Sequence, residues 1–473
     1  MKEDKGVVFS SLEFIFRFLP IFLFVYYLAP KRFRKIVLLI GSIVFYTMGD
    51  FKYLFLMFLS VIVNGTAAKN IWRFPEKITK KKLWLIGALT YNFGTLFFFK
   101  YINFTMENIN GILNIFSKGT SIKLLEIGLP LGISFYTFQA VSYIVDVYQG
   151  EIEEEPSFLN LGTYLFMFPK LVSGPITSYR SIREQMDCPK ITYFKIEEGL
   201  KIFTIGLGMK VLLADPLGIL WKDIQTIGFT SISTPLAWLG AFGYSLQLYF
   251  DFHGYTLMAM GIGKLLGFEL PLNFNHPYMS KSITEFWRRW HITLGNWFKK
   301  YVYIPLGGNR KGKMRLIFNL LIVWLFTGLW HGSSWNYILW GLATFLFVLL
   351  EKLFLKPYLD KSKVLARMYM IIIIPTTWMI FAINDLKDLS IYLGRMFHLV
   401  PGVNVNIGDF VKYLGQYKWF FFLGIFLCLS YGKKWFKGNK NNILFTGILF
   451  FIFWYCIYRL TMGSNNPFMY FQF

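Results

Sequence analysis

The sequence predicts an all-α, polytopic integral membrane protein with about 11–13 membrane segments, some of them re-entrant. Of its 473 residues, 55% are hydrophobic and 20% are aromatic, and its mean hydropathy is positive. Apolar runs close to the roughly 17–25 residues that cross a bilayer as a helix recur along the chain. Lysine and arginine residues lie in the short loops between these runs, where they orient a membrane protein. The net charge of +23 therefore does not indicate a surface for nucleic acid.

The apolar runs follow one another along a single expected domain, residues 1–473, without an internal repeat. Membrane segments are expected at residues 8–29, 36–49, 52–68, 83–102, 127–147, 200–213, 236–266, 314–330, 335–355, 368–383, 419–431 and 443–458. No small-residue cleavage site follows the first run, so we expect a retained span rather than a signal peptide. Basic clusters return to the same side after pairs of spans, which places the amino terminus outside. Residues 105–126 are expected to form a polar segment outside the membrane, and 151–155 and 178–195 are expected to be loops.

Two segments depart from an ordinary lipid-facing helix. The run 127–147 is unusually polar for a span, with Ser134, Tyr136, Thr137, Gln139 and Asp146. Such groups need partners inside a helix bundle, so we expect this helix to be interior. The stretch 166–175 contains two prolines and is too short to span, which indicates a broken helix buried in protein or lining a watery cavity.

Residues 283–304 have the apolar periodicity of one helix but too many charges to cross lipid. On one expected face lie Trp287, Trp290, His291, Leu294 and Phe298. We expect a re-entrant or cytoplasm-facing helix that is folded into the bundle and points His291 into the protein.

Residues 249–340 form the expected catalytic centre, because three of the five histidines lie on motifs there within apolar surroundings. Ionisable groups at membrane depth are costly and are presumed functional. His331 is the leading candidate, since it lies in a Gly-Ser break between two apolar runs. A buried, neutral imidazole can accept a proton from a hydroxyl. A histidine that only forms a hydrogen bond at a helix end would show the same pattern, and this alternative stays open.

The remaining polar groups of this centre are interpreted as supporting residues. His291 is either a second functional histidine or a structural one among tryptophans. Asp251 and His253 are two residues apart, so on a regular helix they point in different directions. No pair among these histidines has the i, i+4 spacing of a helical zinc site, and no metal is expected. His276 and His398 are interpreted as structural.

Other chemistries have little support in the sequence. No Gly-x-Ser-x-Gly elbow and no Walker phosphate loop occurs in the chain. The three cysteines, Cys188, Cys428 and Cys456, have no metal-site spacing, and their odd number argues against a disulfide framework.

Three arginines of the centre, Arg288, Arg289 and Arg310, are candidates to bind phosphates of a cytoplasmic donor. The commoner role of such residues is to anchor and orient a protein at the membrane interface, and this alternative also stays open.

The ordered motifs resemble the membrane-bound O-acyltransferase (MBOAT) superfamily, and within it the bacterial alginate O-acetyltransferase branch. The motifs are LPLGISFY (129–136), the FPK to GP break (168–175), YFDF (249–252), FWRRWH (286–291), YIPLGGN (303–309), GLWHG (328–332) and the terminal PFMYFQF (467–473). They cover nearly the whole chain. His253 departs from the pattern, which favours a small residue such as Ser or Ala at that position.

The resemblance implies a ring of helices around a central funnel or tunnel. It implies that His331 is the essential histidine and His291 the second one. Other residues of the motifs would support the site or line the tunnel, namely Asp251, His253, Trp287, Trp290, Trp330 and Ser333. The implied donor substrate is acetyl-CoA, with no bound cofactor. The implied partners are a polysaccharide acceptor and a separate extracytoplasmic protein of the SGNH-hydrolase type, and the implied location is the bacterial cytoplasmic membrane.

Three alternatives stay open at this point. One is D-alanyl transfer to teichoic acid from a carrier-protein thioester, within the same superfamily. The second is a polysaccharide transporter or channel, against which the lack of an internal repeat argues. The third is a catalytically silent scaffold, against which the intact His291 and His331 argue.

Overall fold

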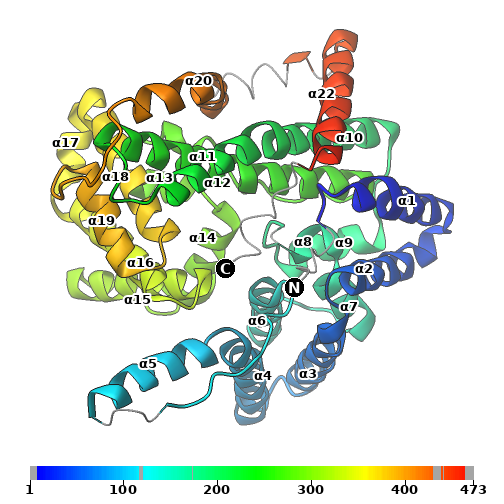
Figure 1. The fold of residues 1–473 in the computed structure, drawn as a ribbon. Helices are drawn as coiled ribbons and strands as arrows, with labels where there is room; N and C mark the ends of the chain where they lie inside the picture. The colour runs from blue at the N-terminus through cyan, green and yellow to red at the C-terminus, as the bar shows by residue number, and fades with distance from the viewer. Residues whose placement is uncertain (1–7, 117–120, 173, 430–437, 440, 464–473) are drawn as a thin grey trace. The chain divides into compact units, whose positions relative to one another are not determined.

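A computed structural model describes residues 8–116, 121–172, 174–429, 438–439 and 441–463. The expected motif 467–473 and the amino-terminal residues 1–7 lie outside the described residues, as does most of the basic loop expected at 433–440. Helices dominate the described ranges, and no strand occurs within them (Figure 1). The all-α class is therefore confirmed. The chain divides into two compact units, and whether they act as one catalytic domain stays a prediction.

Unit 1 comprises Met1–Leu200 and Ala259–Pro271. Its helices are η1 (Phe14–Phe18), α1 (Leu19–Leu28), η2 (Lys31–Phe33), α2 (Arg34–Asp50), η3 (Phe51–Tyr53), α3 (Leu54–Arg73), α4 (Ile78–Lys100), α5 (Ile102–Phe116), α6 (Ile133–Tyr148), α7 (Phe158–Phe166), α8 (Phe168–Leu171), α9 (Tyr179–Asp187) and the start of α10 (Tyr193–Gly208). The helices α3, α4 and α6 pack against one another.

Unit 2 comprises Lys201–Met258 and Leu272–Phe473. Its helices are the rest of α10, η4 (Met209–Ala214), α11 (Asp215–Ile227), most of α12 (Thr234–Leu265), η5 (Pro277–Met279), α13 (Ile283–Arg289), α14 (Ile292–Phe298), η6 (Lys299–Tyr303), α15 (Lys313–His331), α16 (Trp335–Leu350), η7 (Glu351–Leu355), α17 (Lys356–Lys361), α18 (Lys363–Ala382), α19 (Leu386–Met396), α20 (Asp409–Cys428) and α22 (Ile443–Thr461).

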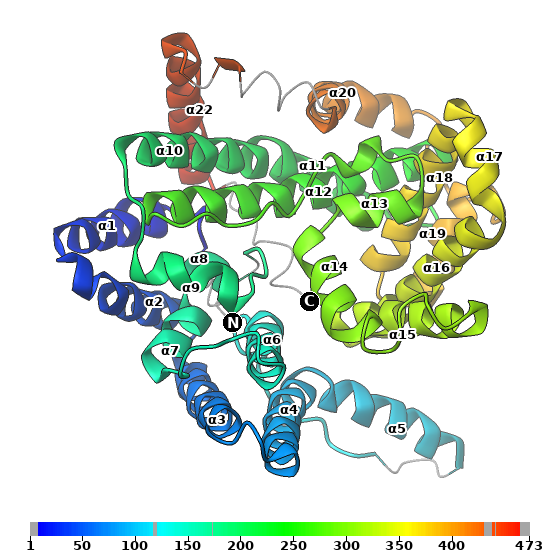
Figure 2. The same ribbon diagram turned by 180° about the vertical axis from the view of Figure 1, so that it is seen from behind.

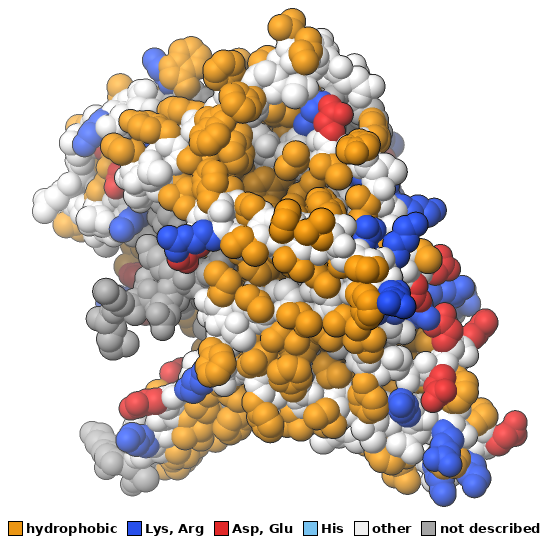
Figure 3. Space-filling model, turned by 90° about the vertical axis from the view of Figure 1, so that its right-hand side faces the viewer, with side chains coloured by type: hydrophobic (Ala, Val, Ile, Leu, Met, Phe, Trp, Pro, Cys, Tyr) orange, Lys and Arg blue, Asp and Glu red, His pale blue; other side chains and the backbone are white. Residues whose placement is uncertain are grey.

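The length and composition of the helices are those of a membrane protein. Six helical stretches of the described chain are long and apolar enough to span a bilayer: Lys31–Arg73, Tyr193–Ile227, Lys313–His331, Trp335–Lys361, Lys363–Ala382 and Ile443–Thr461. The first expected span is shorter than predicted, since its apolar helix covers only Phe14–Leu28. Large hydrophobic side chains are widely exposed, with Phe55 and Phe451 each 74% exposed. They cover much of the face in Figure 3, as expected for side chains that contact lipid.

Helix α6 is interior to unit 1, as its polar composition predicts. Its Gln139 and Asp146 are buried, and Gln139 Oε1 accepts a hydrogen bond of 2.9 Å from the buried Lys170 of α8. The helix begins at Ile133 rather than at residue 127, because Gly132 adopts φ 71°. A Cβ atom at Gly132 would lie 2.6 Å from the carbonyl oxygen of Leu171, so the close approach of α8 requires glycine there. The expected break between α7 and α8 is confirmed.

The expected polar segment 105–126 and the expected loop 178–195 both contain helices. Residues 105–126 include most of α5, which extends from the end of α4 beside a returning extended segment (Figure 2). The Asn103 and Asn110 side chains each exchange two hydrogen bonds with that segment, at Leu125 and Ile122. Residues 178–195 include α9, whose Ser178 caps its first turn. A side-chain cap of this kind does not change the hydropathy of the stretch, so the sequence pattern did not predict α9.

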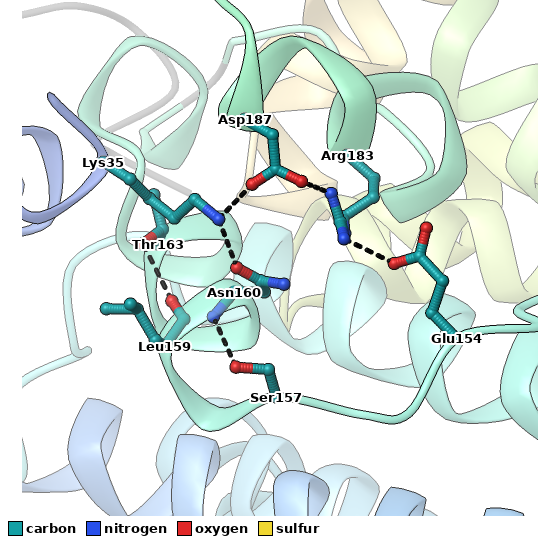
Figure 4. A network of polar contacts seen from close by, with 8 residues as sticks. All are labelled: Lys35, Glu154, Ser157, Leu159, Asn160, Thr163, Arg183 and Asp187. Atoms are coloured by element: carbon teal, nitrogen blue, oxygen red, sulfur yellow. Dashed lines mark hydrogen bonds and ion pairs between the residues drawn. The ribbon is translucent and has the colours of Figure 1, made fainter. Parts of the chain in front are cut away.

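The acidic stretch 151–155 is a largely exposed loop, as predicted, and one of its glutamates forms an ion pair. Glu154 forms an ion pair of 2.6 Å with Arg183 of α9, and Arg183 also pairs with Asp187 (Figure 4). Asp187 pairs in turn with Lys35 at the start of α2, and Lys35 donates a hydrogen bond of 2.7 Å to Asn160. This network ties α2, α7 and α9 together within unit 1.

Candidate active site

The segment expected to be one helix over residues 283–304 is broken at Trp290 and His291. Trp290 is extended, with φ −99° and ψ 132°, and His291 is left-handed, with φ 44°. Backbone hydrogen bonds to an earlier loop hold the break open: Asn275 N donates to Arg289 O at 2.9 Å, and Ile292 N donates to Asn273 O at 3.0 Å. The single-helix prediction is therefore wrong, because these long-range bonds replace the helical ones.

The side chain of Asn273 fixes the orientation of His291. Its Oδ1 atom lies 3.1 Å from His291 Nδ1 and also accepts from Thr293 N at 3.3 Å and Thr293 Oγ1 at 2.9 Å. A backbone N–H can only donate, so the oxygen of the amide must face this side. It follows that His291 Nδ1 carries the proton and that Nε2 carries the lone pair. His291 is buried, as predicted.

Glu351 holds the other end of α13. Its carboxylate accepts hydrogen bonds from Ile283 N and, at 2.8 Å, from Thr284 N. These N–H groups belong to the first turn of α13, where a carboxylate also meets the positive end of the helix dipole. Glu351 begins the π-helical η7 and is itself buried. Both ends of α13 are thus held by residues distant in sequence.

His331 is the last residue of α15, and it lies among aromatic rings. The centroid of its ring is 5.0 Å from Trp330, 5.0 Å from Trp340 and 5.3 Å from Phe381, with interplanar angles of 80°, 85° and 83°. These edge-to-face contacts fix the imidazole plane in an apolar surrounding. The His331 side chain is buried, at 5% exposure.

Glycines allow α15 and α16 to approach closely at this point. A Cβ atom at Gly328 would lie 2.4 Å from Tyr337 O, and one at Gly341 would lie 2.5 Å from Trp324 O. Small residues permit such contact between membrane helices. The side chain of Asn336 then ties the start of α16 to Phe381 O of α18, at 2.9 Å.

The two histidines both contact one indole. The ring of Trp330 is 5.8 Å from that of His291 and 5.0 Å from that of His331. Trp287 and Trp290 belong to the same aromatic cluster, with Trp287 5.4 Å from Trp340 and Trp290 4.9 Å from Trp378. The structure therefore brings together Trp287, Trp290, His291, Trp330 and His331, which the sequence singled out.

Asp251 and His253 have different surroundings. Asp251 pairs with Lys210 at 2.9 Å, and Lys210 also pairs with Asp215 at 2.7 Å. All three charged side chains are buried, and they join η4 and α11 to α12. His253 packs against Tyr249, at 5.1 Å between centroids, on another side of α12. The expectation that these two residues point in different directions is met.

The remaining candidates lie at the periphery. Ser333 is half-buried after the end of α15. Arg288 and Arg310 are exposed, whereas Arg289 pairs with Glu285 at 2.6 Å within α13. Within the described ranges, no three His, Cys, Asp or Glu side chains are grouped so that they would hold a metal ion.

Comparison with known proteins assigns this chain to a family. The model of "MBOAT, membrane-bound O-acyltransferase family" matches residues 151–384. A probable alginate O-acetylase of Pseudomonas syringae is 37% identical over 394 residues, which are 83% of this chain and 75% of the relative. This chain belongs to the membrane-bound O-acyltransferase family.

Other relatives in the family differ in their named activity. The peptidoglycan O-acetyltransferase of Helicobacter pylori is 36% identical over 81% of this chain and 78% of its own length. The teichoic acid D-alanyltransferase of Bacillus subtilis is 32% identical over 45% of this chain and 56% of its own length. The chain is accordingly a multi-pass membrane O-acyltransferase. This family membership argues against a polysaccharide transporter or channel.

Sequence reasoning missed the residues that position the family histidines. Asn273 and Glu351 lie outside the expected motifs, and their roles depend on contacts 18 and 68 residues away. Only their polarity within apolar stretches was visible in the sequence. Burial also sets the protonation of His291, whose segment lies outside the helices long enough to span. Loss of solvation lowers the pKa of this imidazole to about 3. His291 is therefore a neutral imidazole at physiological pH.

Proposed function

We propose that this O-acyltransferase moves an acetyl group from cytoplasmic acetyl-CoA to a hydroxyl of a cell-surface or secreted polysaccharide. The observation that carries the proposal is the contact of Trp330 with both histidines, at 5.8 Å from His291 and 5.0 Å from His331. Two buried imidazoles beside one indole can bind an acceptor that carries hydroxyls and remove the proton of the attacking one. The relatives named as O-acetyl-transferring proteins support an acetyl group on a polymer of the cell envelope.

In the proposed reaction, neutral His331 accepts the proton of the acceptor hydroxyl while its oxygen attacks the thioester carbonyl carbon. The carbon–sulfur bond then breaks, and the thiolate of CoA takes the proton back from the imidazolium. His291, which carries its own proton on Nδ1, has only a lone pair at Nε2, so it accepts a hydrogen bond from a second hydroxyl of the acceptor and thereby orients it. No bound cofactor takes part. The tryptophans Trp287, Trp290 and Trp330 keep the imidazoles in place and exclude water.

The wider setting of the reaction is also part of the proposal. The exposed Arg288 and Arg310 are assigned to the phosphates of the donor, whereas Arg289 is engaged with Glu285. The family resemblance supports a separate SGNH-type partner outside the membrane, which completes transfer to the polysaccharide. It also supports a location in the bacterial cytoplasmic membrane, and the basic clusters between the first spans support an amino terminus outside.

A matched pair of histidine variants tests the proposal. Purified protein in lipid is given radiolabelled acetyl-CoA and an acceptor polysaccharide, and loss of label from CoA is measured. His331→Asn should abolish transfer, because asparagine cannot act as a base. His398→Asn should transfer normally, since His398 is exposed and its left-handed backbone, φ 58°, suits asparagine. Equal rates for wild type and His331→Asn would remove His331 from the chemistry.

The D-alanyl alternative is tested in the same assay. It is favoured by the D-alanyltransferase relative, although that similarity spans only 45% of this chain. Wild-type protein that ignores acetyl-CoA but transfers D-alanine from a carrier-protein thioester would establish this alternative.

A further inference from the structure

The side-chain amide of Asn273 has two ends with different surroundings. Its oxygen is fully used, because it faces His291 Nδ1, Thr293 N and Thr293 Oγ1. Its nitrogen, Nδ2, has no hydrogen-bond partner among the described residues, although Asn273 is only 1% exposed. A buried amide donor without an acceptor is costly and calls for a physical reason.

Rotation of the amide by a half-turn does not remove this cost. It would place the two N–H donors of Nδ2 against the N–H of Thr293, which can only donate. The loop is equally fixed, because Ile292 N donates to Asn273 O at 3.0 Å. The amide is therefore held in one orientation, with its donors turned away from the groups that its oxygen binds.

The Nδ2 atom belongs to the side chain that holds His291. Both ends of the amide share one carbon atom, so Nδ2 lies beside the oxygen that binds His291. His291 is in ring contact with Trp330, which is in contact with His331. A fixed, buried N–H donor that has no partner among the described residues matches what acyl transfer requires, namely a partner for the negative oxygen that develops on the acyl carbonyl.

We propose that Asn273 is a catalytic residue that donates from Nδ2 to the carbonyl oxygen of the acyl thioester as that oxygen becomes an oxyanion. The inference rests on the proposed function for the occurrence of acyl transfer, and it holds for either an acetyl or a D-alanyl group. As the acceptor oxygen bonds to the acyl carbon, the π electron pair moves onto the carbonyl oxygen, and the hydroxyl proton passes to His331. The pair then re-forms the carbonyl, and the carbon–sulfur bond breaks. The departing thiolate takes the proton.

Asn273→Asp tests the amide nitrogen separately from the amide oxygen. The carboxylate keeps an oxygen acceptor for His291 and Thr293 but has no N–H donor. We expect kcat to fall about 10²–10³-fold, the usual effect of losing one oxyanion donor, with KM changed less than about twofold. Asn275→Asp is the matched control, because the Asn275 side chain is exposed and only its backbone N–H, which aspartate keeps, bonds to Arg289; its kcat should equal that of wild type.

A second variant covers the case in which the buried carboxylate prevents folding. Asn273→Ser is smaller, keeps an oxygen acceptor and lacks the amide donors, and it should show the same loss in kcat per folded protein. Wild-type kcat in either folded variant would overturn the proposal. So would a raised KM at unchanged kcat, because the amide would then bind the ground state and the transition state equally. Inactivity of wild type and Asn275→Asp with every thioester would instead reject the proposed function itself.

Discussion

Replacement of Gly328 by alanine tests how closely His331 depends on the contact between α15 and α16. The new Cβ atom would lie 2.4 Å from Tyr337 O, whereas ordinary van der Waals contact begins at 3.4 Å. Neither atom can yield separately, because one belongs to the helix backbone of α15 and the other to that of α16. The helices must therefore separate by about 1 Å, and His331 lies three residues beyond the substitution, at the end of α15.

The expected effect on activity exceeds the effect on stability. Overpacking typically costs about 1–3 kcal/mol, and alanine in place of a helical glycine returns about 1 kcal/mol. A net loss of about 0–2 kcal/mol leaves the protein folded. A displacement of about 1 Å at a catalytic group can lower the rate about 10²-fold. Thermal denaturation in detergent and acyl-transfer kinetics on the same preparation measure both quantities.

Gly87→Ala is the matched control for this substitution. Gly87 lies within α4, and a Cβ atom there would meet nothing within 4 Å. We expect unchanged kcat and a thermal midpoint equal to or above that of wild type. Wild-type kcat in Gly328→Ala would refute the reasoning, because the geometry of His331 would then not depend on this helix contact.

Three further outcomes are expected. Lys210→Met removes the ammonium between Asp215 and Asp251 and should destabilise the protein by about 3–5 kcal/mol. Replacing both aspartates by asparagine in the same protein should recover most of the lost stability, because no buried charge is then left unpaired. Thermal midpoints of the single and triple variants decide this. Glu351→Ala leaves the first N–H groups of α13 without their carboxylate and should lower stability by about 1–3 kcal/mol. It should also lower kcat, and an unchanged kcat would contradict a positioning role for Glu351. For His291, burial lowers the pKa from 6.5 to about 3, so between these values the unfolded chain binds more protons and stability falls as pH falls. The thermal midpoint of His291→Gln should therefore drop less than that of wild type from pH 7 to pH 4.5, and equal drops would contradict the assignment.

Composition and helical periodicity were sufficient for the class of the fold. The interior position of α6 also followed from its sequence, because polar groups such as Gln139 cannot face lipid without a partner. Local features were less accessible. The helix α9 depends on a cap from Ser178, and the break between α13 and α14 depends on bonds from Asn273 and Asn275. Neither kind of contact changes the hydrophobic pattern.

The candidate site was predictable in its histidines but not in their supports. His291 and His331 stood out because a titratable group within apolar sequence is costly. Their shared contact with Trp330 could not be predicted, because 40 residues separate the two histidines and helical periodicity describes only nearby residues. Asn273 was invisible for a related reason: an asparagine near a proline-containing loop is common, and its importance lies in three donors that the fold alone brings to its oxygen.

The π-helical stretches of unit 2 have a consequence for how its sequence is compared with those of relatives. Two of them, η4 and η7, begin next to or at the buried charges Lys210 and Glu351. A π-turn holds more residues than an α-turn, and each residue of an α-helix advances by about 100°. The faces before and after such a turn are therefore out of phase, and a single helical wheel drawn through either stretch assigns one half of the helix to the wrong side. A relative with a regular helix at these positions would need a one-residue gap there, and that gap would mark a change in which side chains reach the interior.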